Sequence, residues 1–290
     1  MKTIPNRVRN TIRRIQFERN LVGKRLRRET VMYSIYTKDE IKADSSKRFA
    51  KLVPFIVGVG LPTVIVCPGG AYQFVSYNNE GADYAHAFNK LGYNVFMLSY
   101  RVSSHAKYPN VFEDLARAIS FVKCHGEKFG TDTDNIILCG SSAGGHLCAC
   151  FAAKYKTFEK PYLGKTYDLK PKALVLSYPV ISLCEDTHEI TCETLLGSGA
   201  SYEVKKSLSV EYIAEKDYPP TFFWHCQGDK TVPVTNSIRL DLRLNNLGVK
   251  HRFIQYPKGG HGIGLGSAST ARGWIYEADK FLKEVLESKD

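Results

Sequence analysis

Two adjacent serines occupy a glycine-rich turn, and the second has the neighbours that a nucleophile needs. The hexapeptide Gly-Ser-Ser-Ala-Gly-Gly begins at Gly140, after the apolar run 135–139 and before the apolar segment 146–154. The pattern Gly-x-Ser-x-Gly predicts that Ser142 lies on a sharp strand-to-helix turn, whose strained backbone has no room for side chains at Gly140 and Gly144. The following helix N-terminus would stabilise the oxyanion formed when Ser142 attacks a carbonyl carbon. A plain Gly/Ser-rich loop is the alternative interpretation.

A serine hydroxyl is a weak nucleophile at neutral pH, so it needs a base and a group that orients the base. His261 is the candidate base, because it lies in a Gly-Gly-His-Gly loop just after an apolar run. Asp229 is the candidate orienting acid, again just past such a run, with Glu185 and Asp186 as its rivals. The chain order is Ser142, Asp229, His261. Because three separate strand ends supply the three required residue types, a catalytic triad is favoured.

An oxyanion also needs N–H donors. Ala143, directly after the nucleophile, is one candidate, and Gly70 and Ala71 in the loop Cys-Pro-Gly-Gly-Ala-Tyr are the others. A simple Pro-Gly turn is the alternative for that loop. Pocket walls are expected from side chains such as Tyr72, a candidate substrate-binding residue, and Trp224.

The elements that must position these residues alternate along the chain. Buried parallel strands are predicted at 63–67, 94–100, 135–139, 173–178, 221–226 and 251–256. Helices are predicted at 81–91, 111–129, 146–154, 235–247 and 269–288. This succession indicates an α/β fold with a doubly wound, mostly parallel sheet and helices on both faces. Segments 31–36 and 49–57 are candidates for an antiparallel edge, and 181–217 for a small insertion or lid over the site.

Most of the positive charge is local. The chain has 290 residues, 43% of them hydrophobic, and a formal net charge of +11. Residues 1–30 hold ten Lys and Arg side chains against two Glu side chains, a local charge of +8, so little remains for the catalytic domain at 31–290. Because this segment has almost no aromatic residues and no nucleic-acid motif, an amphipathic helix packed on the body or forming a homodimer contact is favoured over nucleic-acid binding.

Eight cysteines are scattered without a Cys-x-x-Cys pair or zinc-finger spacing, which predicts reduced thiols in a reducing compartment. No apolar run reaches about 18 residues, and no secretory signal is evident, so no membrane span and a cytoplasmic location are expected. His146 and His225 are expected to serve packing or hydrogen bonding. No metal or organic cofactor is expected.

The chain resembles the α/β-hydrolase superfamily, specifically its bacterial acetyl-esterase and hormone-sensitive-lipase-like branch, often labelled carbohydrate esterase or sugar hydrolase. The resemblance spans about 63–286 and rests on the loop 68–72, Tyr108-Pro109 with Asp114, the serine turn, and segments 228–233 and 260–262. Two positions depart from the family pattern. Ala71 replaces the last glycine of the oxyanion loop, and Ser141 replaces the Asp that often precedes the nucleophile.

The resemblance implies a carboxylesterase with a Ser-Asp-His triad, acting on small ester substrates with short acyl groups, acetyl above all, and on acetylated sugars. The same machinery cleaves amides, so an arylformamidase-like or peptidase-like activity is the nearest alternative. A noncatalytic binding protein of the same fold is a third hypothesis, disfavoured because all three triad candidates are present.

Overall fold

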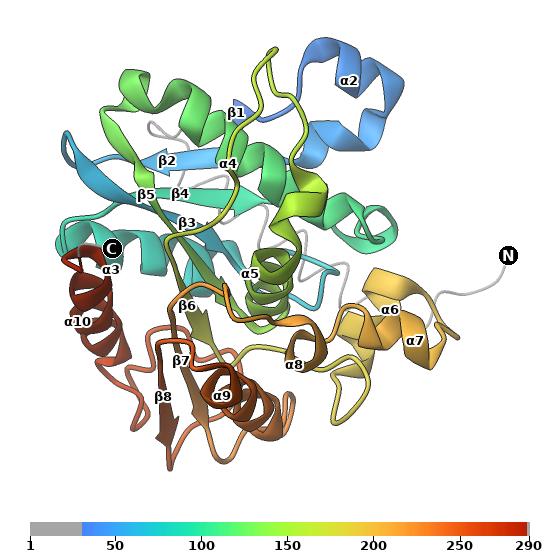
Figure 1. The fold of residues 1–290 in the computed structure, drawn as a ribbon, viewed down its shortest axis with the longest axis vertical. Coiled ribbons are helices and arrows are strands. Elements are labelled where there is room, and N and C mark those ends of the chain that lie inside the picture. Colours follow the sequence, from blue (N-terminus) through green and yellow to red (C-terminus); the bar gives the residue numbers. More distant parts are fainter. Residues whose placement is uncertain (1–30, 289–290) are drawn as a thin grey trace, which may run out of the picture.

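The computed structural model describes residues 31–288 and is organised around one eight-stranded sheet (Figure 1). The strands are β1 (Tyr33–Ser34), β2 (Lys51–Phe55), β3 (Leu61–Cys67), β4 (Asn94–Ser99), β5 (Thr131–Ser141), β6 (Ala173–Ser177), β7 (Thr221–Cys226) and β8 (His251–Tyr256). Their order across the sheet is β1-β2-β4-β3-β5-β6-β7-β8. β3 to β8 run parallel, and β1 and β2 form the predicted antiparallel edge.

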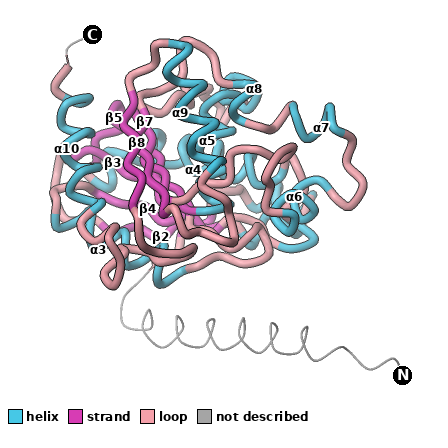
Figure 2. Tube along the Cα trace, turned by 90° about the horizontal axis from the view of Figure 1, so that it is seen from below, coloured by secondary structure: helices cyan, strands magenta, loops and turns pink. Residues whose placement is uncertain are grey.

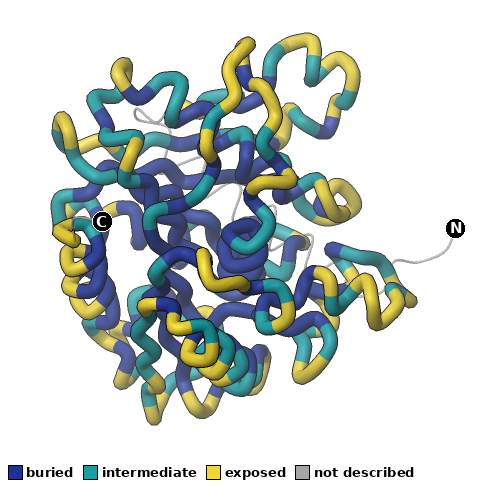
Figure 3. Tube along the Cα trace, in the orientation of Figure 1, coloured by how far each residue is buried: buried dark blue, intermediate teal, exposed yellow. Residues whose placement is uncertain are grey.

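Helices cover both faces of the sheet. The helices are α2 (Lys38–Ala43), α3 (Asp83–Lys90), α4 (Asn110–Phe129), α5 (Ser142–Lys154), α6 (Glu189–Leu196), α7 (Tyr202–Lys206), α8 (Val210–Ile213), α9 (Thr235–Leu247) and α10 (Trp274–Leu286). In Figure 2, α3 and α10 lie on one side of the strands, and α4, α5 and α9 lie on the other. The strands β4, β6 and β7 inside the sheet are buried along their whole length (Figure 3), as expected for strands covered on both faces.

Strand side chains alternate between two hydrophobic cores, one on each face. In β3, Ile65 packs in the core beneath α4 and α5, whereas Val64 and Val66 pack in the core with α3 and α10. This follows from the two-residue period of a strand. The doubly wound α/β architecture expected from the sequence is therefore confirmed.

The register brings several strand ends to one edge. Cys67 of β3 pairs with Gly140 of β5, and Ser141 of β5 pairs with Ser177 of β6. On the far side, Cys226 of β7 pairs with Tyr256 of β8. Loops that leave β3, β5, β7 and β8 consequently begin side by side, which is where α/β folds build their sites.

The predicted elements are all present, with differences at their ends. The strand expected at 135–139 is longer, and α5 begins at Ser142 rather than at residue 146. It can begin so early because Gly144 in its first turn lies against the Cys67 backbone, where a side chain would not fit. The last helix begins at Trp274 rather than at residue 269, since the preceding residues form turns that end at Gly273, with a φ of 90°. A Gly there avoids the strain of the left-handed region.

The insertion expected at 181–217 contains α6, α7 and α8, of which α6 and α7 lie at the rim of the molecule (Figure 1). Its beginning is fixed to the body by Asn236 of α9. The Asn236 side-chain oxygen accepts hydrogen bonds from the Ile181 and Ser182 amides at 2.9 and 3.1 Å, and its nitrogen donates to the Asp186 carbonyl at 3.0 Å. The insertion is therefore anchored beside the loop that carries Asp229, while its action as a lid stays a prediction.

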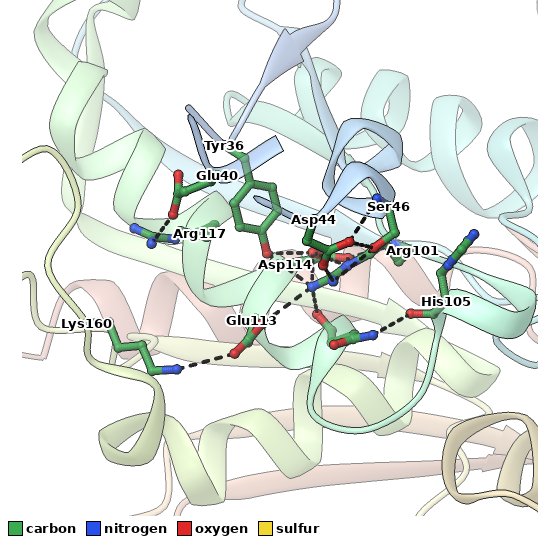
Figure 4. A network of polar contacts seen from close by, with 11 residues as sticks. Tyr36, Glu40, Asp44, Ser46, Arg101, His105, Glu113, Asp114, Arg117 and Lys160 are labelled. Atoms are coloured by element: carbon green, nitrogen blue, oxygen red, sulfur yellow. Dashed lines mark hydrogen bonds and ion pairs between the residues drawn. The ribbon is translucent and has the colours of Figure 1, made fainter. Parts of the chain in front are cut away.

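A buried ion pair attaches the antiparallel edge to the sheet (Figure 4). Arg101 follows β4, and its Nε donates to Asp114 of α4 at 2.9 Å, with both side chains fully buried. The Tyr36 hydroxyl donates to the same carboxylate at 2.7 Å, and an Arg101 Nη1 donates to Asp44 at 3.3 Å. Three segments, carrying Tyr36, Asp44 and Asp114, thus converge on the guanidinium of Arg101.

All eight cysteines are free, and six of them are buried. Within residues 31–288, no helix is long and apolar enough to cross a membrane. The basic segment 1–30, for which a helix is predicted, lies outside the described residues.

Candidate active site

Ser142 lies on a strained turn between β5 and α5. Its φ is +54°, in the left-handed region, which is costly for a residue with a side chain. A Cβ on Gly140 would come 2.2 Å from the Gly144 carbonyl oxygen, and a Cβ on Gly144 would come 2.0 Å from the Cys67 carbonyl oxygen. Both glycines are therefore required by close backbone contacts, as the Gly-x-Ser-x-Gly pattern predicts.

The three triad candidates form one hydrogen-bonded chain. Nε2 of His261 lies 2.7 Å from the Ser142 hydroxyl oxygen, and its Nδ1 lies 2.7 Å from Oδ2 of Asp229. A carboxylate can only accept, so Nδ1 carries the proton and the neutral ring offers Nε2 as an acceptor to the Ser142 hydroxyl. The imidazole is thus placed to remove the proton of the serine, and Asp229 fixes its tautomer.

Asp229 is held as an anion by four donors. Besides His261, His225 Nε2 lies 3.2 Å from Oδ2, and the amides of Thr231 and Val232 donate to Oδ1 at 2.9 and 3.0 Å. Burial raises the pKa of this carboxyl, but hydrogen bonds from His225 and His261 outweigh burial and hold the pKa well below its usual range. Asp229 is consequently ionised at neutral pH.

The rivals for the acidic role are occupied elsewhere. Glu185 and Asp186 lie 3.7 and 3.1 Å from Arg239, and both are substantially exposed. His225 has the structural role expected of it, because Nδ1 bonds to the Ser237 hydroxyl at 2.8 Å and Nε2 to the Val232 carbonyl oxygen at 2.9 Å.

The loop after β3 lies directly against the serine turn. A Cβ on Gly69 would come 2.9 Å from the Ser142 Cβ. Gly70 and Ala71 follow with φ values of 129° and 54°. Among the described residues, neither the Gly70 nor the Ala71 amide has a hydrogen-bond partner. Together with Ala143 in the first turn of α5, these N–H groups are available to a developing oxyanion, and Ala71 adopts the left-handed angle despite its Cβ.

Tyr72 differs from the expectation that it binds substrate. Its side chain is fully buried, and its hydroxyl lies 2.9 Å from Nδ1 of His146. His146 Nε2 in turn lies 2.9 Å from the Leu208 carbonyl oxygen in the insertion. His146 therefore has the hydrogen-bonding role expected of it, and Tyr72 supports the candidate oxyanion loop from inside the protein instead of facing a ligand.

Trp224 is not a pocket wall either. Its side chain is fully buried in the core beside α3 and α10, and its indole nitrogen donates to the Ser177 hydroxyl at 3.0 Å. Two residues without a predicted role, Glu80 and Tyr178, also lie at the site and hydrogen-bond to each other at 2.7 Å. Neither belongs to a glycine-rich motif, so no local signal singled them out.

Within residues 31–288, no group of three or more His, Cys, Asp or Glu side chains is arranged to hold a metal ion.

Comparison with known proteins decides the family. The BD-FAE family model matches residues 54–244, which is more than half of the chain. The chain belongs to the BD-FAE family. Its resemblance to carbohydrate esterases of the α/β-hydrolase superfamily is thereby confirmed.

Named relatives of this BD-FAE chain include ester hydrolases. An acetyl ester-xyloside bifunctional hydrolase from Caldicellulosiruptor lactoaceticus has a solved structure with a TM-score of 0.81 and 32% identity, covering 88% of this chain and 96% of that one. Endo-1,4-beta-xylanase B of Butyrivibrio fibrisolvens is 30% identical over 216 residues, 73% of this chain and 34% of that protein. Acetylxylan esterase of Xylanibacter ruminicola is 26% identical over 229 residues, 77% of this chain and 44% of that protein. The BD-FAE chain thus spans less than half the length of these two curated relatives.

Proposed function

We propose that this protein is a serine carboxylesterase that removes short acyl groups, above all acetyl groups, from acetylated saccharides. The observation that carries the proposal is the unbroken chain from the Ser142 hydroxyl through His261 to Asp229, at 2.7 Å for each contact. The named relatives, which include an acetylxylan esterase and an acetyl ester hydrolase, support the substrate class.

In the proposed reaction, Ser142 attacks the ester carbonyl while His261 takes the serine proton. The tetrahedral oxyanion is stabilised by the amides of Gly70, Ala71 and Ala143, and Asp229 stabilises the imidazolium. His261 then gives its proton to the leaving alcohol, and an acyl-enzyme remains. Water, activated by the same histidine, hydrolyses the acyl-enzyme and releases the free acid.

Hydrolysis of a p-nitrophenyl ester series from acetate to decanoate tests this proposal, together with acetate release from acetylated xylo-oligosaccharides. We expect turnover to be fastest with acetate, and kcat to fall at least about 10³-fold in Ser142→Ala and in His261→Ala. Ser141→Ala is the matched control, since it removes the neighbouring hydroxyl, which is buried in the same turn.

Turnover of aryl formamides or peptides without ester turnover would replace the proposal with an amide-directed hydrolase. A protein that binds these ligands and turns over none of them would be a noncatalytic member of the fold. Activity that survives Ser142→Ala would overturn the assignment of the nucleophile.

We further propose a cytoplasmic location, supported by eight unpaired cysteines. The proposed homodimer contact through the basic segment 1–30 is tested by sedimentation of the full chain beside a chain without residues 1–28. A dimer mass that persists after the deletion would contradict it.

A further inference from the structure

A buried carboxylate lies beneath the candidate oxyanion loop. Glu80 is in a π-helical turn (Tyr77–Ala82) before α3 and is only 3% exposed. Its Oε2 accepts a hydrogen bond from the Gly69 amide at 2.9 Å, and its Oε1 accepts one from the Tyr178 hydroxyl at 2.7 Å. A carboxylate is costly to bury unless its oxygens have such donors, so each contact is needed where Glu80 lies.

Tyr178 reaches Glu80 from the other side of the site. It directly follows β6 with a φ of +37°, and its ring centroid lies 4.8 Å from that of His261. Its hydroxyl donates to Glu80 and accepts a hydrogen bond from the Gly264 amide at 3.0 Å. Gly264 is in the same loop as His261, three residues further along the chain.

Glu80 therefore connects two loops that lie far apart in the sequence. One contact holds Gly69, next to the two free oxyanion donors, and the other holds the histidine loop through Tyr178 and Gly264. We propose that Glu80 is a positioning residue that fixes the oxyanion loop and the His261 loop relative to each other, with Tyr178 as the connecting group. This inference rests on the proposed esterase function.

The charge of Glu80 adds a second effect. Both oxygens accept hydrogen bonds, which is the arrangement of an ionised carboxylate. Burial raises the pKa of Glu80 above its usual range, although the Tyr178 hydroxyl, the charge of His261 and the Gly69 amide oppose that increase. A negative charge near His261 stabilises the imidazolium that forms during acyl transfer.

The titratable groups that face His261 are few among the described residues. They are Asp229 and Ser142 by hydrogen bonds, Tyr178 by ring contact, and Glu80 and His188 by charge interaction. Tyr178 is the group among them that contacts both Glu80 and the loop of His261.

The test compares Glu80→Gln, Tyr178→Phe and the double variant with p-nitrophenyl acetate. In each single variant, the two loops would shift slightly from their productive positions. We therefore expect kcat to fall about 10- to 100-fold, with KM changed by less than about threefold. The double variant should be no slower than the slower single variant, since both changes break one connection. Wild-type kcat in a folded Glu80→Gln protein, or losses that multiply in the double variant, would overturn the proposal.

A second buried tyrosine–carboxylate pair supplies the matched control. The Tyr93 hydroxyl donates to Asp279 of α10 at 2.9 Å, on the face of the sheet that carries α3 and α10. Tyr93→Phe and Asp279→Asn should lower the melting temperature and leave kcat unchanged. If either of these substitutions lowers kcat as much as Glu80→Gln does, a general loss of stability explains both results and the proposal fails.

Hydrogen–deuterium exchange separates this proposal from the proposed function, because it needs no substrate. In Glu80→Gln, peptides covering 68–76 and 259–266 should both exchange faster than in the wild type by at least about tenfold. Faster exchange in 68–76 alone would show that Glu80 does not connect the loops. If the wild type hydrolyses no ester while both peptides respond, the esterase assignment fails and the connection between the loops stands.

Discussion

Three histidines near the site are distinguished by the partners of their ring nitrogens. His261 has a carboxylate on Nδ1 and a serine hydroxyl on Nε2, so it is the one placed for proton transfer. His225 bonds to a serine hydroxyl, a carbonyl oxygen and the Asp229 carboxylate, and His146 to a tyrosine hydroxyl and a carbonyl oxygen. Neither contacts the Ser142 hydroxyl, so both are structural supports. Residue type alone did not assign these roles, whereas the hydrogen-bond partners do.

His146 predicts a pH dependence of stability. Burial lowers its pKa to about 4 from the usual 6.5. Between these values the unfolded chain binds a proton that the folded chain does not, so the stability is fully present above pH 6.5 and is lost as pH falls toward 4. Because of this shift, we expect His146 to lower the free energy of unfolding by about 3 kcal/mol as the pH falls from 7.5 to 4.

Urea unfolding of the wild type and His146→Gln at both pH values measures this effect. Glutamine can still accept from Tyr72 and donate to the Leu208 carbonyl, but it does not titrate. The variant should therefore lose about 3 kcal/mol less than the wild type over that pH interval. Equal losses in the two proteins would mean that His146 is not kept neutral by burial.

At the scale of elements, the antiparallel edge depends on polar contacts as well as on strand pairing. β1 pairs with β2 over only two residues, and α2 has no buried residue. The Arg101 network instead connects Tyr36 and Asp44 of this edge to Asp114 of α4 (Figure 4). A change in one side chain of the network should consequently affect several elements together.

Asp114→Ala is expected to destabilise the protein strongly. It leaves the Arg101 guanidinium buried without its main counter-charge, and loss of one partner from a buried pair typically costs about 3–5 kcal/mol. Urea unfolding at pH 7.5 measures the loss. Asp217→Ala is the control, since it removes the exposed ion pair with Lys156, which should leave the unfolding midpoint unchanged. Similar behaviour of the two variants would show that the Arg101 network contributes no more than a surface pair.

At the scale of the whole molecule, two cores enclose the sheet and most of the thiols. Six cysteines are buried, and Cys124 and Cys184 are partly exposed. Burial also raises the pKa of Cys184, which lowers its thiolate fraction at neutral pH. The protein therefore needs no disulfide for its stability, and its thiols report on unfolding.

Titration with a thiol-reactive disulfide at pH 7.5 should modify at most two cysteines in the native protein and all eight in urea. Cys124→Ser combined with Cys184→Ser should abolish the native reaction. The unfolding midpoint should be the same with and without reductant, because all eight cysteines are free. A midpoint that falls on reduction, or native labelling that persists in the double variant, would contradict this arrangement.

Sequence patterns alone predict the sheet, its helices, and the three residues that lie within hydrogen-bond distance in the structure, Ser142, His261 and Asp229. These features depend on local patterns. Strands and helices have characteristic periods of apolar residues, and the glycines around Ser142 are required by a turn that involves only nearby residues and the adjacent strand. Parallel strands then bring their carboxyl ends to one edge, so the residues that follow them meet.

The side chains that support the site from within are evident only from the three-dimensional packing. Tyr72 and Trp224 were expected to face a ligand but are fully buried, and the contacts of Glu80 join residues as far apart as Gly69 and Tyr178. Such contacts depend on how the loops and helices pack in three dimensions. No short-range pattern encodes them, because a buried polar side chain finds its partner by proximity in space and not by spacing along the chain.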